Sequence, residues 1–258
     1  MKQRIAIITG ASSGMGELFA RTVCDHAELD EVWVIARRAE RLEALREAVP
    51  AKLRIFACDL SDRQSFATLG DALEQEKPDV RWLVNCSGYG KFCATTDAPL
   101  ADNLNMMDLN CGAVMGMCQT ALPYMQAGAH ILNIASVAAF QPIPYINVYG
   151  ATKAFVLHYS RGLNRELKKR GIVVTAVCPF WTKTEFFNRA VDRKKDAVVK
   201  KYVAMYKPEQ IVRRAWRDAE RGKDVSRFGF VARCQALLTK ILPHSLVMSV
   251  WMRQQKLN

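Results

Sequence analysis

The chain has 258 residues, of which 50% are hydrophobic, enough for one large domain or two small ones. It contains no apolar run of about 18 residues or more, so we expect no transmembrane helix, and its start lacks the pattern of a secretory signal. We therefore expect a cytoplasmic protein. The eight cysteines and four histidines show no metal-site spacing, which predicts buried thiols and no metal.

The positive charge is unevenly distributed. The formal net charge is +12, and residues 183–233 alone hold 15 Lys and Arg against 7 Asp and Glu. Such a segment is typical of solvated helix faces, but an anionic substrate or an anionic membrane surface would also suit it. No nucleic-acid-binding motif accompanies the charge, so we expect no nucleic-acid partner.

Short apolar runs rich in β-branched residues alternate with helical segments along the chain. The predicted strands are 4–9, 31–36, 53–58, 80–86, 130–136 and 172–178. The longer predicted helices are 14–27, 99–127 and 149–170, and Ser61 and Asp97 are expected N-caps. This order predicts one α/β domain, with a doubly wound, mostly parallel sheet and helices on both faces. We place that domain at 1–230, followed by an extra C-terminal helical tail at 231–258.

A glycine-rich turn follows the first predicted strand and opens the first helix. It reads "TGASSGMG" at 9–16 and contains Gly10, Gly14 and Gly16. Glycine permits close backbone approach, and a helix N-terminus offers free N–H groups to a pyrophosphate. In this position the turn predicts a dinucleotide-binding loop.

The second strand ends in Arg37 and Arg38, where a carboxylate would bind the ribose 2′-hydroxyl of NAD. A guanidinium instead suits a 2′-phosphate, so the sequence favours NADP(H) over NAD(H). The alternative is that both arginines simply begin a charged helix.

The segment "YGATK" places Tyr149 and Lys153 four residues apart at the start of a predicted helix, on one face. A cation there would lower the pKa of the phenol and make it a proton donor near neutral pH. The plainer alternative is a surface lysine beside a half-buried tyrosine.

These motifs, in this order and spacing, resemble the short-chain dehydrogenase/reductase (SDR) family over about residues 4–230. The resemblance rests on "TGASSGMG", "NCSG" at 85–88, Asn110, Ser136 and "YGATK". It implies a Rossmann fold and a catalytic group in which Tyr149 is the acid/base and Lys153 lowers its pKa and holds the nicotinamide ribose. Ser136 would bind the substrate oxygen, and Asn110 would anchor a water leading to Lys153.

The resemblance also implies a set of cofactor-binding residues. These are Gly10, Ser12, Ser13, Gly14, Met15, Gly16, Arg37, Arg38, Asp59, Leu60, Asn85, Ser87, Gly88, Tyr149, Lys153, Thr182 and Thr184. The chain departs from the family at Phe180, where Pro-Gly is usual after the sixth strand. A phenylalanine there would either alter the loop over the nicotinamide, which carries the two threonines, or add an aromatic wall to the substrate site.

Aromatic and apolar residues are expected to border the substrate. They are Phe140, Pro142, Pro144, Ile146, Phe180, Trp181, Phe186 and Phe187. We infer a hydrophobic ketone or alcohol, such as a steroid, a fatty or acyl ketone, or a bulky xenobiotic carbonyl. The alternative is that several of them are ordinary core.

The tail has apolar residues at helical spacing, mixed with Lys and Arg. It is expected to close the substrate site, to pack on a partner subunit, or to lie in a membrane interface.

The sequence therefore predicts an NADP(H)-dependent ketone/alcohol oxidoreductase. The resemblance to the SDR family further implies a homo-oligomer that forms through the helices near 100–127 and 149–170. The alternatives are a 3-ketoacyl thioester reductase, whose basic 189–201 segment would meet an acidic carrier, and a weakly active NADPH-binding regulatory protein.

Overall fold

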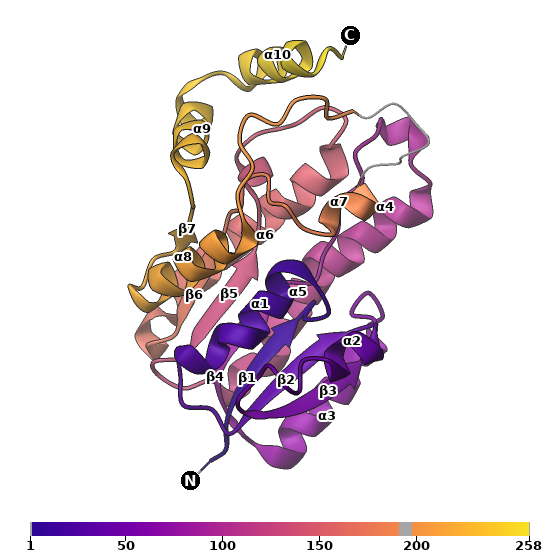
Figure 1. Ribbon diagram of the computed structural model, residues 1–258. Helices are drawn as coiled ribbons and strands as arrows, with labels where there is room; N and C mark the ends of the chain where they lie inside the picture. Colours follow the sequence, from indigo (N-terminus) through magenta and orange to yellow (C-terminus); the bar gives the residue numbers. More distant parts are fainter. Residues whose placement is uncertain (1, 191–197, 258) are drawn as a thin grey trace.

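The computed structural model describes residues 2–190 and 198–257. In this part of the chain one seven-stranded sheet is formed, all parallel, in the order β3-β2-β1-β4-β5-β6-β7 (Figure 1). The strands are β1 (Arg4–Thr9), β2 (Glu31–Ala36), β3 (Lys52–Ala57), β4 (Asp79–Asn85), β5 (His130–Ile134), β6 (Val173–Val177) and β7 (Val225–Ser226). The order reverses direction between β1 and β4, the position at which open α/β sheets bind ligands.

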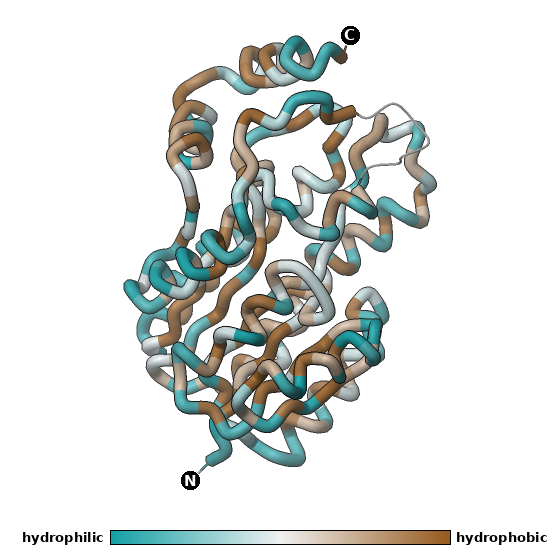
Figure 2. The backbone as a smooth tube through the Cα atoms, viewed as in Figure 1, coloured by the Kyte–Doolittle hydropathy of each residue, from teal (hydrophilic) through white to brown (hydrophobic). Residues whose placement is uncertain are grey.

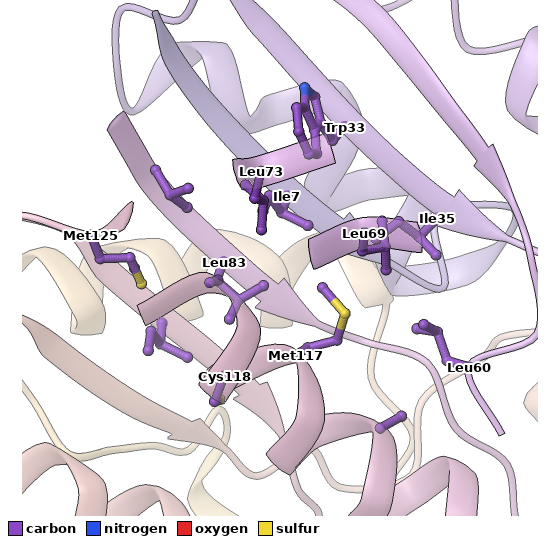
Figure 3. Close-up of a cluster of buried hydrophobic side chains, with 14 of the residues drawn as sticks. Ile7, Trp33, Ile35, Leu60, Leu69, Leu73, Leu83, Met117, Cys118 and Met125 are labelled. Atoms are coloured by element: carbon purple, nitrogen blue, oxygen red, sulfur yellow. The ribbon is translucent and has the colours of Figure 1, made fainter. Parts of the chain in front are cut away.

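Side chains alternate between the two faces of the sheet along each strand, and helices bury both faces. Ile5 and Ile7 point to one face, and Ala6 and Ile8 to the other. The first face is covered by α3 (Gln64–Glu76), α4 (Leu100–Met107), α5 (Ala113–Ala121) and α6 (Asn147–Glu166). The second is covered by α1 (Gly14–Thr22), α2 (Ala39–Glu43) and α8 (Pro208–Glu220). Figure 3 shows the core on the first face, where Trp33 of β2 lies near Leu73 of α3 and Ile35 of β2 lies near Leu69.

The predicted strands agree with the structure to within two residues at each end, and the predicted doubly wound fold is confirmed. The expected helix 99–127 is interrupted by a π-helical turn at Asp108–Gly112. Both predicted caps are wrong. Helix α3 begins only at Gln64, whose N–H is bound by Asp62, and α4 begins at Leu100 after Pro99. The two-residue β7 was not predicted.

The expected C-terminal tail consists of α9 (Phe230–Ile241) and α10 (His244–Gln255), which we call the C-terminal arm. It extends from the edge of the sheet and passes over the segment that precedes α8 (Figure 1). Trp251 Nε1 donates to the Pro144 carbonyl at 3.1 Å. Gln255 Oε1 accepts from the Lys200 and Lys201 amides at 2.8 and 2.9 Å. These bonds fix the far end of the arm to the body of the protein.

None of the helices in 2–190 or 198–257 combines the length and apolar character needed to cross a membrane. The division of the chain at residue 230 stays a prediction about domain organisation.

Candidate active site

A cleft of about 570 Å³ lies at the carboxyl ends of β1 to β4. Most of the predicted cofactor residues line it: Gly10, Ser12, Ser13, Gly14, Met15, Arg37, Arg38, Asp59, Leu60, Ser87, Gly88 and Thr184. Separate strands and loops thus bring these residues to one edge of the sheet, as expected where parallel strands end together.

Two glycines allow the first strand and first helix to approach closely. A Cβ on Gly16 would lie 2.2 Å from the carbonyl oxygen of Gly10. Gly10 itself has φ +68°, and a Cβ there would lie 2.8 Å from the backbone nitrogen of Ser87. Gly16 does not line the cleft. Its role is to let α1 begin beside β1, so that the helix N-terminus faces the cleft.

Arginines occupy the side of the cleft formed by β2 and α2. Arg38 donates to Ser12 Oγ at 3.1 Å, which ties the glycine-rich loop to the end of β2. Arg37 lies 3.5 Å from the Asp59 carboxylate. Sequence reasoning missed Arg41, which also lines the cleft three residues after Arg38. Three guanidinium groups at one end of the cleft are a suitable environment for a phosphate.

Glu185 was also missed. Its carboxylate pairs with Arg41 at 2.8 Å and with Arg38 at 3.4 Å. These hydrogen bonds lower the pKa of Glu185 and hold it ionised. No sequence signal points to this contact, because Glu185 lies over 140 residues from either arginine.

Asn85 was predicted to bind the cofactor, but it does not line the cleft. Its side chain is buried and donates to Asn133 Oδ1 at 2.8 Å, so it joins β4 to β5 instead of lining the cleft. Thr182 lines a second cavity, which adjoins the cleft, and its hydroxyl donates to the Phe180 carbonyl. Thr184 lines both the cleft and this second cavity.

Ser136, Tyr149 and Lys153 lie together in the second cavity. Ser136 follows β5, and Tyr149 and Lys153 occupy the first turns of α6. Tyr149 and Ser136 are joined by a side-chain hydrogen bond. Lys153 Nζ donates to the Ile134 carbonyl at 2.7 Å and lies 5.7 Å from the centre of the Tyr149 ring.

Asn110 is fully buried in the π-helical turn behind this group. Its Nδ2 donates to the Tyr89 carbonyl at 2.8 Å and to Thr152 Oγ1 at 3.0 Å, and its Oδ1 accepts from the Tyr89 amide. Asn110 thus holds the loop after β4 against α6. It does not line either cavity.

The pKa values differ from the expectation that Lys153 lowers the pKa of Tyr149. Burial raises the pKa of Tyr149 to about 12, and the hydrogen bond from Ser136 only partly opposes this. Burial also lowers the pKa of Lys153 to about 8. The lysine is itself desolvated and bonded to a carbonyl, so in this structure the phenol is a proton donor that stays protonated at neutral pH.

The second cavity has a volume of about 550 Å³ and is mostly apolar. It shares Met15, Cys86, Gly88, Thr184 and Phe186 with the cofactor cleft, so the two spaces meet beside Tyr149. Of the predicted aromatic and apolar border, Ile146, Phe180, Trp181, Phe186 and Phe187 line it, whereas Phe140, Pro142 and Pro144 do not.

Sequence reasoning missed two parts of this cavity. Phe92, which follows β4, packs edge-on against Tyr149 with ring centres 6.0 Å apart. Gln235 of α9 donates to the buried Gln141 at 3.3 Å, which places a polar pair in an otherwise apolar wall. The arm therefore forms part of the cavity, which was one of the three uses expected of the tail.

The described residues contain no group of three His, Cys, Asp or Glu side chains that could hold a metal. The site places a protonated phenol, a hydroxyl and a lysine between an arginine-lined cleft and an apolar cavity.

Comparison with known proteins identifies the family of this chain. A family model described as short chain dehydrogenase matches residues 4–195. Sulfoacetaldehyde reductase 2 of Chromohalobacter salexigens is 35% identical over 188 residues, which are 70% of this chain and 74% of that protein.

Two solved structures cover nearly the whole chain. A short-chain dehydrogenase from Sphingobium yanoikuyae in complex with NADPH has a TM-score of 0.78 at 28% identity, and 95% of each chain is covered. A bulky-bulky ketone specific alcohol dehydrogenase from Comamonas testosteroni has a TM-score of 0.74 at 26% identity, covering 96% of this chain and 95% of that one. The family model matches about three quarters of the sequence, so the chain belongs to the short-chain dehydrogenase family of oxidoreductases.

Proposed function

We propose that this protein is an NADP(H)-dependent oxidoreductase that interconverts a hydrophobic ketone and its secondary alcohol. The observation that carries the proposal is that the cleft and the apolar cavity meet beside the phenol of Tyr149. An arginine-lined cleft and an apolar cavity share walls, and Tyr149 and Ser136 lie beside the place where they join.

The cleft fits NADP(H). The glycine-rich loop leaves room for a pyrophosphate at the N-terminus of α1, and Arg38 and Arg41 stand where a 2′-phosphate would extend beyond the end of β2. When bound, the cofactor supplies or accepts a hydride at the nicotinamide ring. The NADPH complex of the Sphingobium relative supports this choice of cofactor.

The residues of this chain donate the proton and position the carbonyl oxygen that receives it. In reduction, Tyr149 donates its phenolic proton to the carbonyl oxygen, while the Ser136 hydroxyl binds the same oxygen and fixes its position. Lys153, one turn along α6, holds the nicotinamide ribose and places a positive charge near the phenolate that forms. Positioned acid catalysis of this kind contributes roughly 10²–10⁴-fold to the rate.

The cavity favours a bulky apolar substrate of steroid-like or acyl-ketone shape. About 550 Å³ of space is enclosed mainly by aromatic and aliphatic side chains, and the Gln141–Gln235 pair offers one polar contact away from Tyr149. The specificity of the Comamonas neighbour for bulky-bulky ketones supports this class.

The test is NADPH consumption over a panel of hydrophobic ketones, run beside a 3-ketoacyl thioester in free and carrier-bound form. We expect turnover of bulky free ketones. Preference for the carrier-bound thioester, with a KM that rises with salt, would instead support the thioester reductase. The basic segment expected to meet a carrier, 189–201, includes residues 191–197, which lie outside the described part of the chain. NADPH binding without turnover of any compound would support the regulatory protein.

We also propose a homo-oligomer that forms through α4, α5 and α6. These helices expose a group of large apolar side chains, Leu100, Leu104, Met107, Met115 and Phe155. Leu100, Leu104 and Met107 follow the i, i+4, i+7 spacing of a single helix face, which is the pattern of a helix that packs on another.

A further inference from the structure

The C-terminal arm exposes large apolar side chains to solvent on both of its helices. On α9 they are Phe230, Leu237, Leu238 and Ile241, which recur at helical spacing, and on α10 they are Leu246 and Val250. Leu237 and Ile241 are 58% and 71% exposed. Figure 2 shows hydrophobic segments on both helices of the arm, at the margin of the molecule. We call this surface the arm face.

The arm face is flanked by positive charge alone. Arg233 and Lys240 lie beside the apolar stripe of α9, and Arg253 and Lys256 are exposed on α10. No Asp or Glu follows Asp224 in the sequence. Exposed apolar residues bordered by Lys and Arg, with no carboxylate among them, are the features of a helix that lies in an anionic lipid interface.

A second copy of the chain fits this face poorly. A two-fold contact would pair the face with itself and set one group of cations against the same group on the partner. Phosphate headgroups neutralise those cations, and the acyl region accepts the leucine and isoleucine side chains. Charge complementarity therefore selects a lipid surface over self-association.

The substrate cavity opens on the same surface. Phe230, Leu238, Leu242, Leu246 and Val250 line that cavity and are also exposed. These side chains form an apolar opening of the cavity that Tyr149 also lines.

We propose that the arm face docks on an anionic membrane surface, with the mouth of the substrate cavity turned toward the lipid. A hydrophobic ketone dissolved in the bilayer then reaches Tyr149 without crossing bulk water. This last step rests on the proposed function, whereas the docking does not.

The test is flotation of the full-length protein with vesicles of phosphatidylcholine alone or mixed with phosphatidylglycerol, at low and high salt. We expect binding to the mixed vesicles at low salt, and release at high salt. Leu237→Ser/Ile241→Ser and Lys240→Glu/Arg253→Glu should each weaken binding by roughly tenfold or more. These four residues do not line the substrate cavity, so circular dichroism and NADPH binding should match the wild type.

The matched control is Lys168→Glu/Lys169→Glu, which reverses two exposed cations outside the arm, just before the amino end of β6. This variant should bind like the wild type. The proposal is overturned if the wild type does not float with mixed vesicles, or if the arm variants and the control lose binding equally. It is also overturned if Leu237→Ser/Ile241→Ser changes the oligomeric mass while vesicle binding is unaffected. Flotation needs neither cofactor nor ketone, so its failure leaves the proposed reaction untouched.

Discussion

At the scale of single residues, the site depends on groups whose ionisation is set by burial. Tyr149 and Lys153 are both desolvated, which raises the pKa of the phenol and lowers that of the amine. The arginines differ, since they lie in an open cleft and act through hydrogen bonds and ion pairs. Proton transfer therefore depends on the ionisation of Tyr149 and Lys153, whereas phosphate recognition depends on the arginines of the cleft.

Replacing Arg38 by Ala should weaken NADPH binding much more than NADH binding. Arg38 stands beside Ser12 at the end of the cleft, and losing a charge-assisted contact to a 2′-phosphate costs roughly 10- to 100-fold in affinity. The measurement is the Kd of each cofactor by fluorescence titration. Arg46→Ala, which removes an arginine outside the cleft, is the matched control. Equal losses for the two cofactors would contradict a 2′-phosphate role.

The rate of ketone reduction should fall as pH rises through about 8. Tyr149 remains protonated there, but Lys153 loses its proton near that pH, and with it the charge that stabilises the phenolate. Below pH 8 both groups are protonated and the rate should be level. Above it, kcat/KM should drop about tenfold per pH unit. The check is a pH profile at saturating NADPH. A profile that stays level through pH 9 would rule out this role for the Lys153 charge.

At the scale of elements, the sequence predicted β1 to β6 well because each strand reads as a short apolar run, and all but the edge strand β3 are largely buried. The catalytic and glycine-rich motifs were predicted for a similar reason, since local spacing on one helix or turn fixes them. Asn85 was misplaced because its partner, Asn133, lies on another strand. Glu185 and Gln235 were missed because their contacts with Arg41 and Gln141 exist only once distant segments fold together.

His130 on β5 should make the protein sensitive to acid. Its ring stacks on Trp82 at 4.2 Å, its Nδ1 has no hydrogen-bond partner, and burial lowers its pKa to about 4. The unfolded chain takes up this proton near pH 6.5, so the free energy of unfolding should decrease as pH falls from about 6.5 to about 4.

The variant His130→Phe keeps a ring against Trp82 and removes the titrating group. Its denaturant midpoint should therefore depend less on pH in that window. The comparison is urea unfolding at pH 7 and pH 5, with His158→Asn, an exposed histidine of α6, as the control. An unchanged pH dependence in His130→Phe would show that other groups cause the loss of stability.

At the scale of the whole molecule, the described residues expose large apolar side chains both on α4, α5 and α6 and on the C-terminal arm. The surface on α4, α5 and α6 is the proposed site of self-association, and the arm face is the proposed membrane contact. They lie on different parts of the molecule, as the positions of α4 and the arm in Figure 1 show. One subunit could therefore use both at once.

Leu104→Asp/Met107→Asp should weaken the oligomer at least about tenfold, because buried charges in an apolar interface have no partner. The measurement is molar mass by light scattering over a range of concentrations. Leu237→Ser/Ile241→Ser on the arm should leave the mass unchanged. A wild-type chain that is monomeric at every concentration would contradict the proposed interface.

The central claim is that Tyr149 donates the proton in an NADPH-dependent ketone reduction. It is tested most directly by measuring single-turnover reduction of a bulky ketone, with NADPH affinity, in the wild type and in Tyr149→Phe. The account predicts that the variant loses roughly 10²–10⁴-fold in rate, while the Kd for NADPH stays within about twofold. A variant that keeps most of its rate with NADPH bound would contradict it, because the proton would then come from another group.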